Sequence, residues 1–538
     1  MSKVIYVCLR NPSSMAVEKD RVKRVCDNLT PDNLDPHPAI VTANDNVIIG
    51  IFNPVPSIML KAASVCLGNL LGSPSEWHQP GSKIPDGTYA LIRGNSNEME
   101  AIADYVGSRT IWYVHTKDLF IASTSQRMII AYLGSYRPDR NVYSWILSTG
   151  SLGPGLSWDK RIKCLPGNSR FILNRESWTA RLEQGTVRFQ ESNLRYQDHY
   201  ERLKKAIEVT MNSMRIDYAQ WALLLSGGQD SRTILLHLPN PKKINTLTWG
   251  LKSSIKVKNS DAYIAKKIAD YIGCPHQYYP TDISAHLSLR TLFDRFLSIG
   301  EGRIDHFSGY ADGFNLWNKL HAQGVSGVIR GDGGFGYVPC KDEQDVRFRV
   351  GMPLLTDFVN LTDRLHQIGI APNLLPHHLN RKKTESIPLW RDRLFHQYRI
   401  PSIHAALNDL KLSHVEIANP YLSRRIILEA RKLPDHLRTS KKLFKDIANA
   451  VNPGIDYAQY RSTARTKDLL NQNETIAFLK KEIRHSKVLP NSLKNLLDKE
   501  MAPHPNKIRH HMNINVLGFR AFIIASMNTI LTKDASLL

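Results

Sequence analysis

The sequence contains few cysteines and no cysteine pair at a metal-binding spacing. Its 538 residues include six cysteines, which are scattered along the chain without a CxxC motif. A structural zinc site and a disulfide scaffold are therefore not expected. Dispersed cysteines in a chain of this length are typical of a protein that works in a reducing cytoplasm, which is the localisation we expect.

Long hydrophobic runs are also missing. No window approaches the roughly 18 uninterrupted apolar residues that indicate a membrane span, so no contact with a membrane is expected. The most apolar stretch, 514–531, contains Arg520 and Asn528, and we expect it to form a buried terminal helix. The run VIYVCL near the N-terminus is too short for the core of a signal peptide and lacks a small-residue cleavage site.

Acidic residues are outnumbered by basic ones. The chain has 71 Lys and Arg against 49 Asp and Glu, a formal net charge of +22, with 42% hydrophobic residues. The hydrophobic content is that of a globular protein. The basic excess indicates an anionic partner such as a nucleotide, a nucleic acid, an acidic peptide or a membrane surface; the alternative is a solvated basic surface.

The pattern of strands and helices changes near residue 193. Before it, short runs rich in Val, Ile, Tyr and Thr predict strands, and segments 57–72 and 140–150 look helical. After it, strand and helix patterns alternate, which is typical of a parallel sheet with helices on both faces, and helical segments dominate the last part. We expect two domains, 1–192 with an α+β or sandwich fold and 193–538 with an α/β fold and a helical C-terminal part. The strands predicted in the first domain are IYVCL, AIVTA, VIIGIF, TYALI, TIWYV and LFIAS.

A glycine-rich turn, Ser-Gly-Gly-Gln-Asp-Ser at 226–231, follows the apolar run WALLL and precedes a helical pattern. A helix that begins in such a turn has unpaired N–H groups and a positive dipole end, which together bind anions. Glycines remove the Cβ atoms that would keep a phosphate away, and Ser226 and Ser231 add hydroxyl donors. Asp230 would repel phosphate, so it suits a Mg²⁺ ion that phosphate oxygens share. The turn therefore predicts a nucleotide-phosphate loop; the alternative is an ordinary Ser-Gly turn.

The turn also resembles the SGGxDS loop of the ATP pyrophosphatases, which cut ATP between the α and β phosphates. Three further stretches resemble the asparagine-synthetase group in order and spacing, namely 261–279, 324–337 and 416–447.

Four upstream stretches resemble the class II glutamine-amidotransferase domain of the same group, namely 85–92, 104–114, 119–129 and 163–173. The resemblance implies an amidotransferase-like (Ntn) β-sandwich domain, which is followed by an α/β domain like that of the adenine-nucleotide α-hydrolases.

The resemblance implies ATP and Mg²⁺ as cofactors, with Asp230 and Asp332 as metal ligands. Lys441 is implied as a catalytic residue, with its neighbour Lys442 as the alternative, because a fixed cation stabilises negative charge that develops at the reacting carbonyl. Asp332 is the second catalytic candidate, either as a base for the attacking amine or as a ligand of Mg²⁺. The implied nucleotide contacts are Leu225, Ser226, Gly227, Gly228, Gln229, Asp230, Ser231, Thr248, Gly250, Arg330 and Gly331.

The sequence departs from the family at several positions. Ser2 stands where the family has a nucleophilic cysteine, and Cys8 lies inside an apolar strand, where a structural thiol is expected. If the alignment has no gap, Phe335 stands where the family has an acid that is usually a second ligand of magnesium. Either Asp332 binds the metal in its place, or a local gap shifts the alignment, or the ATP chemistry is weakened.

Other matches are expected to be structural. Ser423 and Ala418 replace a family aspartate and arginine. Glu416 and Asp305 match family acids, and we expect ion pairs in the core for both. The histidine-containing stretch 396–404 has no spacing for a closed metal site and is expected on the surface.

The missing cysteine is shared with the branch that resembles β-lactam synthetases, carbapenam synthetases and lasso-peptide cyclases. There, ATP adenylates a carboxylate and an amine of the same substrate closes a ring. We expect an AMP-forming carbon–nitrogen ligase that closes a macrolactam in a ribosomal precursor peptide, with a leader-peptide protease as a further partner. The alternatives are the same chemistry on a small molecule, a tRNA-modifying ATP pyrophosphatase, which the amidotransferase-like first domain disfavours, and a non-catalytic nucleotide-sensing scaffold.

Overall fold

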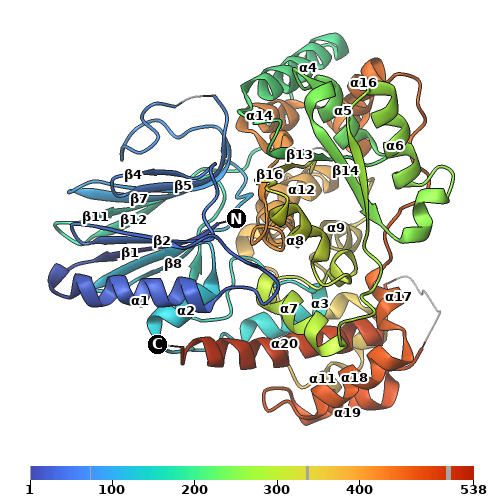
Figure 1. Cartoon of the computed structure of the whole chain (residues 1–538). Helices are drawn as coiled ribbons and strands as arrows, with labels where there is room; N and C mark the ends of the chain where they lie inside the picture. Colours follow the sequence, from blue (N-terminus) through green and yellow to red (C-terminus); the bar gives the residue numbers. More distant parts are fainter. Residues whose placement is uncertain (1, 73, 335–337, 504–509, 538) are drawn as a thin grey trace.

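The computed structural model of the chain describes residues 2–72, 74–334, 338–503 and 510–537. It is a mixed α/β structure with two antiparallel sheets, a parallel sheet and covering helices (Figure 1). The antiparallel strands are β1 (Lys3–Leu9), β2 (Ile40–Asn44), β3 (Val47–Phe52), β4 (Met59–Lys61), β5 (Ser64–Leu70), β6 (Gly87–Gly94), β7 (Glu98–Ala103), β8 (Trp112–His115), β9 (Leu119–Ser123), β10 (Lys163–Cys164), β11 (Ser169–Asn174) and β12 (Ala180–Gln184). They form one sheet in the order β10-β8-β9-β1-β3-β2 and a second in the order β12-β11-β7-β6-β5-β4. All six strands predicted for this part are present.

The two antiparallel sheets pack face to face, and helices cover the outer face of the first sheet (Figure 1). Along β1, Tyr6 and Cys8 point into the core between the sheets, while Ile5 and Val7 pack against the helices. Successive side chains of a strand point to opposite faces, so a strand buried on both faces is apolar throughout. This explains the uninterrupted run VIYVCL. The covering helices are α1 (Met15–Asn28) and α2 (Gln126–Leu133), whereas α3 (Asn141–Thr149) packs against the C-terminal helix α20 (Ile514–Asp534).

The helix predicted over 57–72 is wrong, because this segment forms the hairpin β4–β5. Leu67 faces the core between the sheets and Cys66 faces the outer side, so both faces of the strand are apolar and no period of two is visible in the sequence. A Cβ at Gly68, whose φ is +112°, would lie 2.3 Å from the carbonyl oxygen of Thr88. The close pairing of β5 with β6 therefore requires glycine there.

The parallel sheet has the order β15-β14-β13-β16-β17, as the alternating pattern after residue 193 predicts. Helices bury both of its faces: in β13, Leu223 packs against one helical layer and Leu224 against the other. Because all strands of this sheet run parallel, their carboxyl ends lie at one edge, where loops from distant parts of the chain meet. The strands are β13 (Trp221–Leu224), β14 (Asn245–Gly250), β15 (His276–Pro280), β16 (Gly327–Ile329) and β17 (Glu416–Ala418).

Helices dominate the chain after residue 193, as expected. They are α4 (Tyr196–Ser213), α5 (Gln229–His237), α6 (Asp261–Ile272), α7 (Leu289–Gly300), α8 (Asn315–Ala322), α9 (Glu343–Val350), α10 (Val359–Thr362), α11 (Leu365–Ile368), α12 (Ile387–Leu394), α13 (Ala405–Asp409), α14 (Arg424–Lys432), α15 (Asp435–Arg438), α16 (Lys442–Val451), α17 (Thr466–Leu470), α18 (Asn473–Arg484), α19 (Asn491–Glu500) and α20 (Ile514–Asp534). By length and composition α20 is apolar enough to cross a membrane, but 61% of its most apolar window is buried inside the protein. It packs against α2, α3 and α18 as a core helix.

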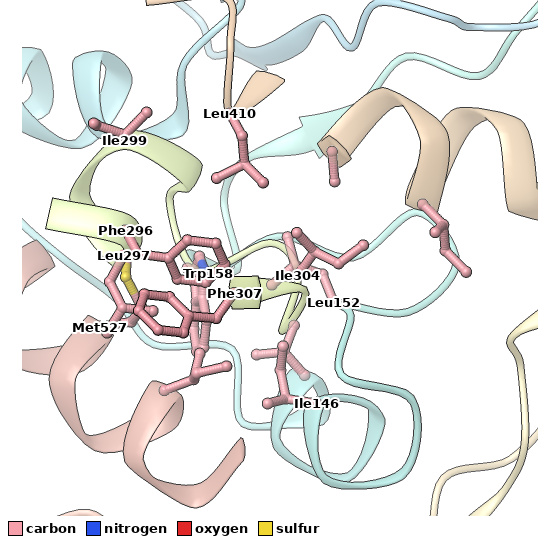
Figure 2. Close-up of a cluster of buried hydrophobic side chains, with 14 of the residues drawn as sticks. Ile146, Leu152, Trp158, Phe296, Leu297, Ile299, Ile304, Phe307, Leu410 and Met527 are labelled. Atoms are coloured by element: carbon pink, nitrogen blue, oxygen red, sulfur yellow. The ribbon is translucent and has the colours of Figure 1, made fainter. Parts of the chain in front are cut away.

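One hydrophobic core joins the antiparallel part to the rest of the chain. Figure 2 shows Ile146 of α3 and Trp158 in the same cluster as Phe296 of α7 and Met527 of α20. The chain leaves β12 at Gln184 and enters α4 at Tyr196, so the change of architecture falls between them. The division into domains at 192 stays a prediction, because the two parts share this core.

Buried ion pairs also connect the two parts. Arg109 donates hydrogen bonds of 2.7 and 2.9 Å to the two carboxylate oxygens of Glu416, and both side chains are at most 5% exposed. Arg109 also donates to the carbonyl oxygen of Ser2 at 2.8 Å. Lys3 at the start of β1 pairs with Glu301 at 3.1 Å. These contacts hold the start of the first sheet against the parallel sheet.

The substitution Arg109→Ala should lower the free energy of unfolding by about 3–5 kcal/mol, because it leaves the Glu416 carboxylate buried without its partner. Urea denaturation at pH 7 measures this. Arg24→Ala is the control: it removes an exposed pair with Asp20 and should cost less than about 1 kcal/mol. Equal, small losses in the two variants would contradict a structural role for the buried pair.

Candidate functional site

The turn between β13 and α5 has the geometry of an anion-binding loop. The Ser226 N–H donates to the Ser231 hydroxyl at 2.9 Å, and the Gly228 N–H donates to the Ser226 hydroxyl at 3.2 Å. Gly228 is the N-cap of α5 and, as a glycine, has no side chain that could accept hydrogen bonds from the N–H groups of the first turn. The N–H groups of the first turn are therefore open to an anion.

The two glycines of the turn have different roles. A Cβ at Gly227 would lie 2.5 Å from the side chain of Ala458, so glycine is required there for packing. A Cβ at Gly228 would meet one atom within 4 Å, the Ser226 hydroxyl at 3.3 Å. Gly228 therefore faces open space beside the N-terminus of α5, where a phosphate can approach.

Asp230 and Lys441, residues predicted separately as a metal ligand and a catalytic cation, form an ion pair. The Lys441 ammonium lies 2.7 and 3.0 Å from the two carboxylate oxygens of Asp230. The side chains are 23% and 32% exposed, so the pair is open to solvent on one side. Lys442 is exposed and begins α16, so Lys441 is the lysine that faces the turn.

The backbone at Lys441 is unusual. Ser440 and Lys441 have φ values of +57° and +58°, and left-handed backbone costs a residue with a side chain about 1–2 kcal/mol. Two such residues in succession persist only where the surroundings impose them, and such strain gathers at functional sites. Here the left-handed pair directs the Lys441 side chain towards Asp230.

The second glycine loop, which follows β16, lies against the first. A Cβ at Gly331 would be 3.1 Å from that of Asp230, and Arg330 donates to Asp332 at 3.0 Å. The other carboxylate oxygen of Asp332 is buried and has no hydrogen-bond partner among the described residues. Burial would raise the pKa of Asp332, but the nearby charge of Arg330 and smaller contributions from His404 and Lys411 lower it below its usual value.

Two residues that the sequence did not indicate, His404 and Lys411, lie near Asp332 of this second loop. Lys411 is 2% exposed, donates to the carbonyl oxygen of Leu407 at 2.6 Å and lies 5.7 and 5.6 Å from the ring centroids of Tyr310 and Trp317. Burial and the charge of Arg330 lower the pKa of Lys411 well below its usual value. Burial lowers the pKa of His404 to about 4. No motif in the sequence points to either residue, because only the fold brings them to Asp332.

Two predicted nucleotide contacts are not at an open surface. Thr248 is buried, and its hydroxyl donates to the carbonyl oxygen of Leu225 at 2.5 Å. A Cβ at Gly250 would lie 2.4 Å from the carbonyl oxygen of Ser462, which also accepts a hydrogen bond from the Leu251 N–H at 2.7 Å. The segment that includes Ser462 therefore lies directly against Gly250, and Thr248 is bonded to the residue that precedes the first loop.

The carboxylates fit Mg²⁺ only together with phosphate oxygens. Among the described residues there is no group of three or more His, Cys, Asp or Glu side chains that could hold a metal ion. Asp230 and Asp332 lie on adjoining loops, and Mg²⁺ is often bound by one or two carboxylates plus substrate phosphates. The bare oxygen of Asp332 is consistent with such a shared ion. Phe335 lies outside the described residues.

The surface location expected for 396–404 is wrong at His396, which lies in a π-helical segment, Phe395–His404, and is 4% exposed. Its Nε2 lies 3.0 Å from the carbonyl oxygen of Gly334, and its Nδ1 accepts from Arg431 at 3.1 Å. These partners fix a neutral ring that carries its proton on Nε2. Burial and the charge of Arg431 lower the pKa of His396 well below its usual value.

The remaining predicted acids and the possible nucleophiles are structural. Glu416 pairs with Arg109, and Asp305 pairs with Arg520 at 2.7 Å, as expected. Burial raises the pKa of the Cys8 thiol to about 11, so this thiol is not a nucleophile at neutral pH. Ser2 is fully buried, and its hydroxyl donates to the carbonyl oxygen of Asn53 at 3.1 Å.

No protein-family model and no curated protein matches the chain. Among solved structures, one described as the allosteric regulatory enzyme of purine biosynthesis is 9% identical, over 53% of this chain and 67% of that chain, with a TM-score of 0.21. A glutamine phosphoribosylpyrophosphate amidotransferase from B. subtilis, complexed with ADP and GMP, is 8% identical, over 51% and 65%, with a TM-score of 0.19. Each match thus spans about two thirds of the other chain. Both are enzymes by description, but likeness at these TM-scores supports no conclusion about the activity of this chain.

We predict that the pH dependence of stability changes when His396 is replaced. Above its ordinary pKa of 6.5 the ring is neutral in both states. Below pH 6.5 the His396 side chain takes up a proton in the unfolded chain, whereas in the folded protein it stays neutral until the pH reaches its lower pKa. The free energy of unfolding therefore decreases as the pH is lowered through this window. His396→Asn should be less stable at pH 7 but lose less stability between pH 7 and pH 5, measured by urea denaturation. The exposed His485→Asn is the control, and a pH slope for His396→Asn equal to that of the unmodified protein would contradict the assignment.

Proposed function

We propose that the chain is an ATP-dependent, AMP- and pyrophosphate-forming carbon–nitrogen ligase. The observation that carries this proposal is the Asp230–Lys441 ion pair at the open N-terminus of α5. A metal-binding carboxylate and a cation for a developing negative charge are both needed where ATP and a carboxylate react. In the free protein each of these two charges compensates the other.

The residues of the first loop are suited to the phosphates of ATP. The N–H groups at the start of α5 and the hydroxyls of Ser226 and Ser231 supply donors without a repelling side chain at Gly228. Bound Mg²⁺, held by Asp230 and Asp332, would neutralise phosphate charge and make pyrophosphate a better leaving group. Lys441 then stabilises negative charge on the oxygen atoms of the reacting carboxylate and the α-phosphate.

The geometry favours a metal-binding role for Asp332 over the alternative role as a general base. A carboxylate whose pKa lies below its usual value is a weak proton acceptor at neutral pH. Its bare oxygen beside the first loop suits a cation. We therefore assign Asp332 to the metal and leave deprotonation of the amine to another group.

The proposed substrate is a peptide whose own amine attacks its adenylated carboxylate, so that a macrolactam forms. The first part of the chain supports this choice, since its sheets enclose a buried Ser2 and an unreactive Cys8 and offer no activated thiol in the described structure to release ammonia from glutamine. The proposed setting is the cytoplasm, with a precursor peptide and a leader-peptide protease as partners. The net charge of +22 suits an acidic peptide.

Gly228→Ala should weaken binding of ATP at least about tenfold without unfolding the protein, because its methyl group enters the space where a phosphate approaches. Isothermal titration with ATP and Mg²⁺ measures the affinity. Gly309→Ala, at another glycine with open surroundings, should bind ATP as the unmodified protein does. Unchanged affinity in Gly228→Ala would remove the first loop from the ATP site.

Lys441→Met should reduce turnover at least about 100-fold, because its cation stabilises charge that develops during the reaction. The assay is exchange of labelled pyrophosphate into ATP, run with a library of acidic precursor peptides and, separately, with small β-amino acids. Lys442→Met is the matched control and should retain activity. Exchange with small acids alone would reassign the substrate class, and no exchange with any carboxylate would refute the ligase proposal.

A further inference from the structure

The turn that precedes Lys441 is attached to a buried cluster of charges. Arg438, which is 1% exposed, donates from Nε to a carboxylate oxygen of Asp392 at 2.5 Å. It donates from other nitrogens to Glu191 at 3.2 Å and to the carbonyl oxygen of Leu433. Arg438 is therefore fixed at both its backbone and its guanidinium group, three residues before Lys441.

A second buried arginine reaches the same turn from α12. Arg391, also 1% exposed, donates to Asp392 at 2.8 and 3.0 Å and to the hydroxyl of Thr439 at 2.9 Å. The Thr439 hydroxyl in turn donates to Asp435 at 2.7 Å. Thr439 directly precedes the left-handed pair Ser440–Lys441, so these bonds set the point from which that pair starts.

The same arginine also contacts the segment that follows the second glycine loop. Arg391 donates from Nη1 to the carbonyl oxygen of Val338 at 3.1 Å. One side chain thus joins α12, the turn before Lys441 and the segment that follows the loop of Asp332.

We propose that Asp392, with Arg391 and Arg438, is a positioning cluster that holds Lys441 in its left-handed backbone against Asp230. The effect of this cluster on catalysis rests on the proposed function, whereas its effect on the position of Lys441 does not. Apolar side chains of similar volume often stabilise a fold as well as buried arginines around a carboxylate do, whereas the directed hydrogen bonds of the arginines fix one geometry of the turn. None of the three residues needs to touch substrate.

The direct test measures the position of Lys441 through its reactivity. The protein is treated with the N-hydroxysuccinimide ester of acetic acid, and mass spectrometry compares acetylation of Lys441 with that of the exposed Lys442 in the same molecule. In the unmodified protein the ion pair with Asp230 should make Lys441 react about fivefold more slowly than Lys442. In Asp392→Asn and in Thr439→Val this difference should disappear, while Thr439→Ser, which keeps the hydroxyl, should behave as the unmodified protein.

Asp357→Asn is the matched control. Asp357 is a buried aspartate that pairs with Arg347 at 2.8 Å in another part of the helical region. This variant should lose stability comparable to that lost by Asp392→Asn yet keep the slow acetylation of Lys441, ATP affinity and turnover. Thr439→Val should lower turnover with little change in the Michaelis constant for ATP.

The outcomes separate the positioning proposal from the proposed function. Slow acetylation of Lys441 in both Asp392→Asn and Thr439→Val would overturn the positioning cluster, whatever the activity. If Asp392→Asn does not fold, Thr439→Val against Thr439→Ser decides alone. Faster acetylation in a protein that shows no ATP-dependent exchange would support the cluster and refute the ligase.

Discussion

The ion pair between Asp230 and Lys441 is the interaction on which the candidate site depends. The two residues are separated by 211 positions in the chain, and their charged groups approach to 2.7 Å. Asp230 lies in the first turn of α5, directly after the central strand β13, whereas Lys441 lies between α15 and α16 in the helical part that follows the last strand of the sheet. Only a parallel sheet that collects its loops at one edge brings them together.

The parallel sheet, the buried charges around Asp392 and the antiparallel sandwich together hold this ion pair in place. Helices bury both faces of the parallel sheet, so β13 cannot shift without disturbing two layers of side chains. The left-handed backbone at Ser440 and Lys441 is unfavourable by itself and is imposed by the buried charges around Asp392. The antiparallel sandwich is tied to the same sheet through Glu416 of β17, which pairs with Arg109.

Much of the fold could be predicted from the sequence, because its strands are short, apolar and bounded by turn residues. The failure at 57–72 has a physical cause: a strand buried on both faces shows no alternation, and its apolar run cannot be told from a helix by pattern. The first glycine loop and Lys441 were found from local motifs, and the structure brings them together. Whether these residues bind ATP stays a prediction.

What could not be predicted depends on contacts between distant segments. Lys411 and Asp392 have no distinctive neighbours in the sequence, and only tertiary packing makes them part of the site. Thr248 and Gly250 are predicted to contact nucleotide, and this stays a prediction; in the structure Thr248 is buried and Ser462 lies against Gly250. A sequence motif indicates which residue types are available, whereas burial and the paths of remote segments decide which of them face the ligand.

The most direct test of the central claim is a crystal structure with Mg²⁺ and α,β-methylene-ATP, an analogue that cannot be cut between its α and β phosphates. We expect the phosphates to accept hydrogen bonds from the N–H groups that begin α5, the metal ion to contact Asp230, and the Lys441 ammonium to move from that carboxylate towards the α-phosphate. A nucleotide bound elsewhere, or a first loop that stays empty at saturating analogue with the Asp230–Lys441 pair unchanged, would contradict the assignment of this edge of the sheet as the site of ATP chemistry.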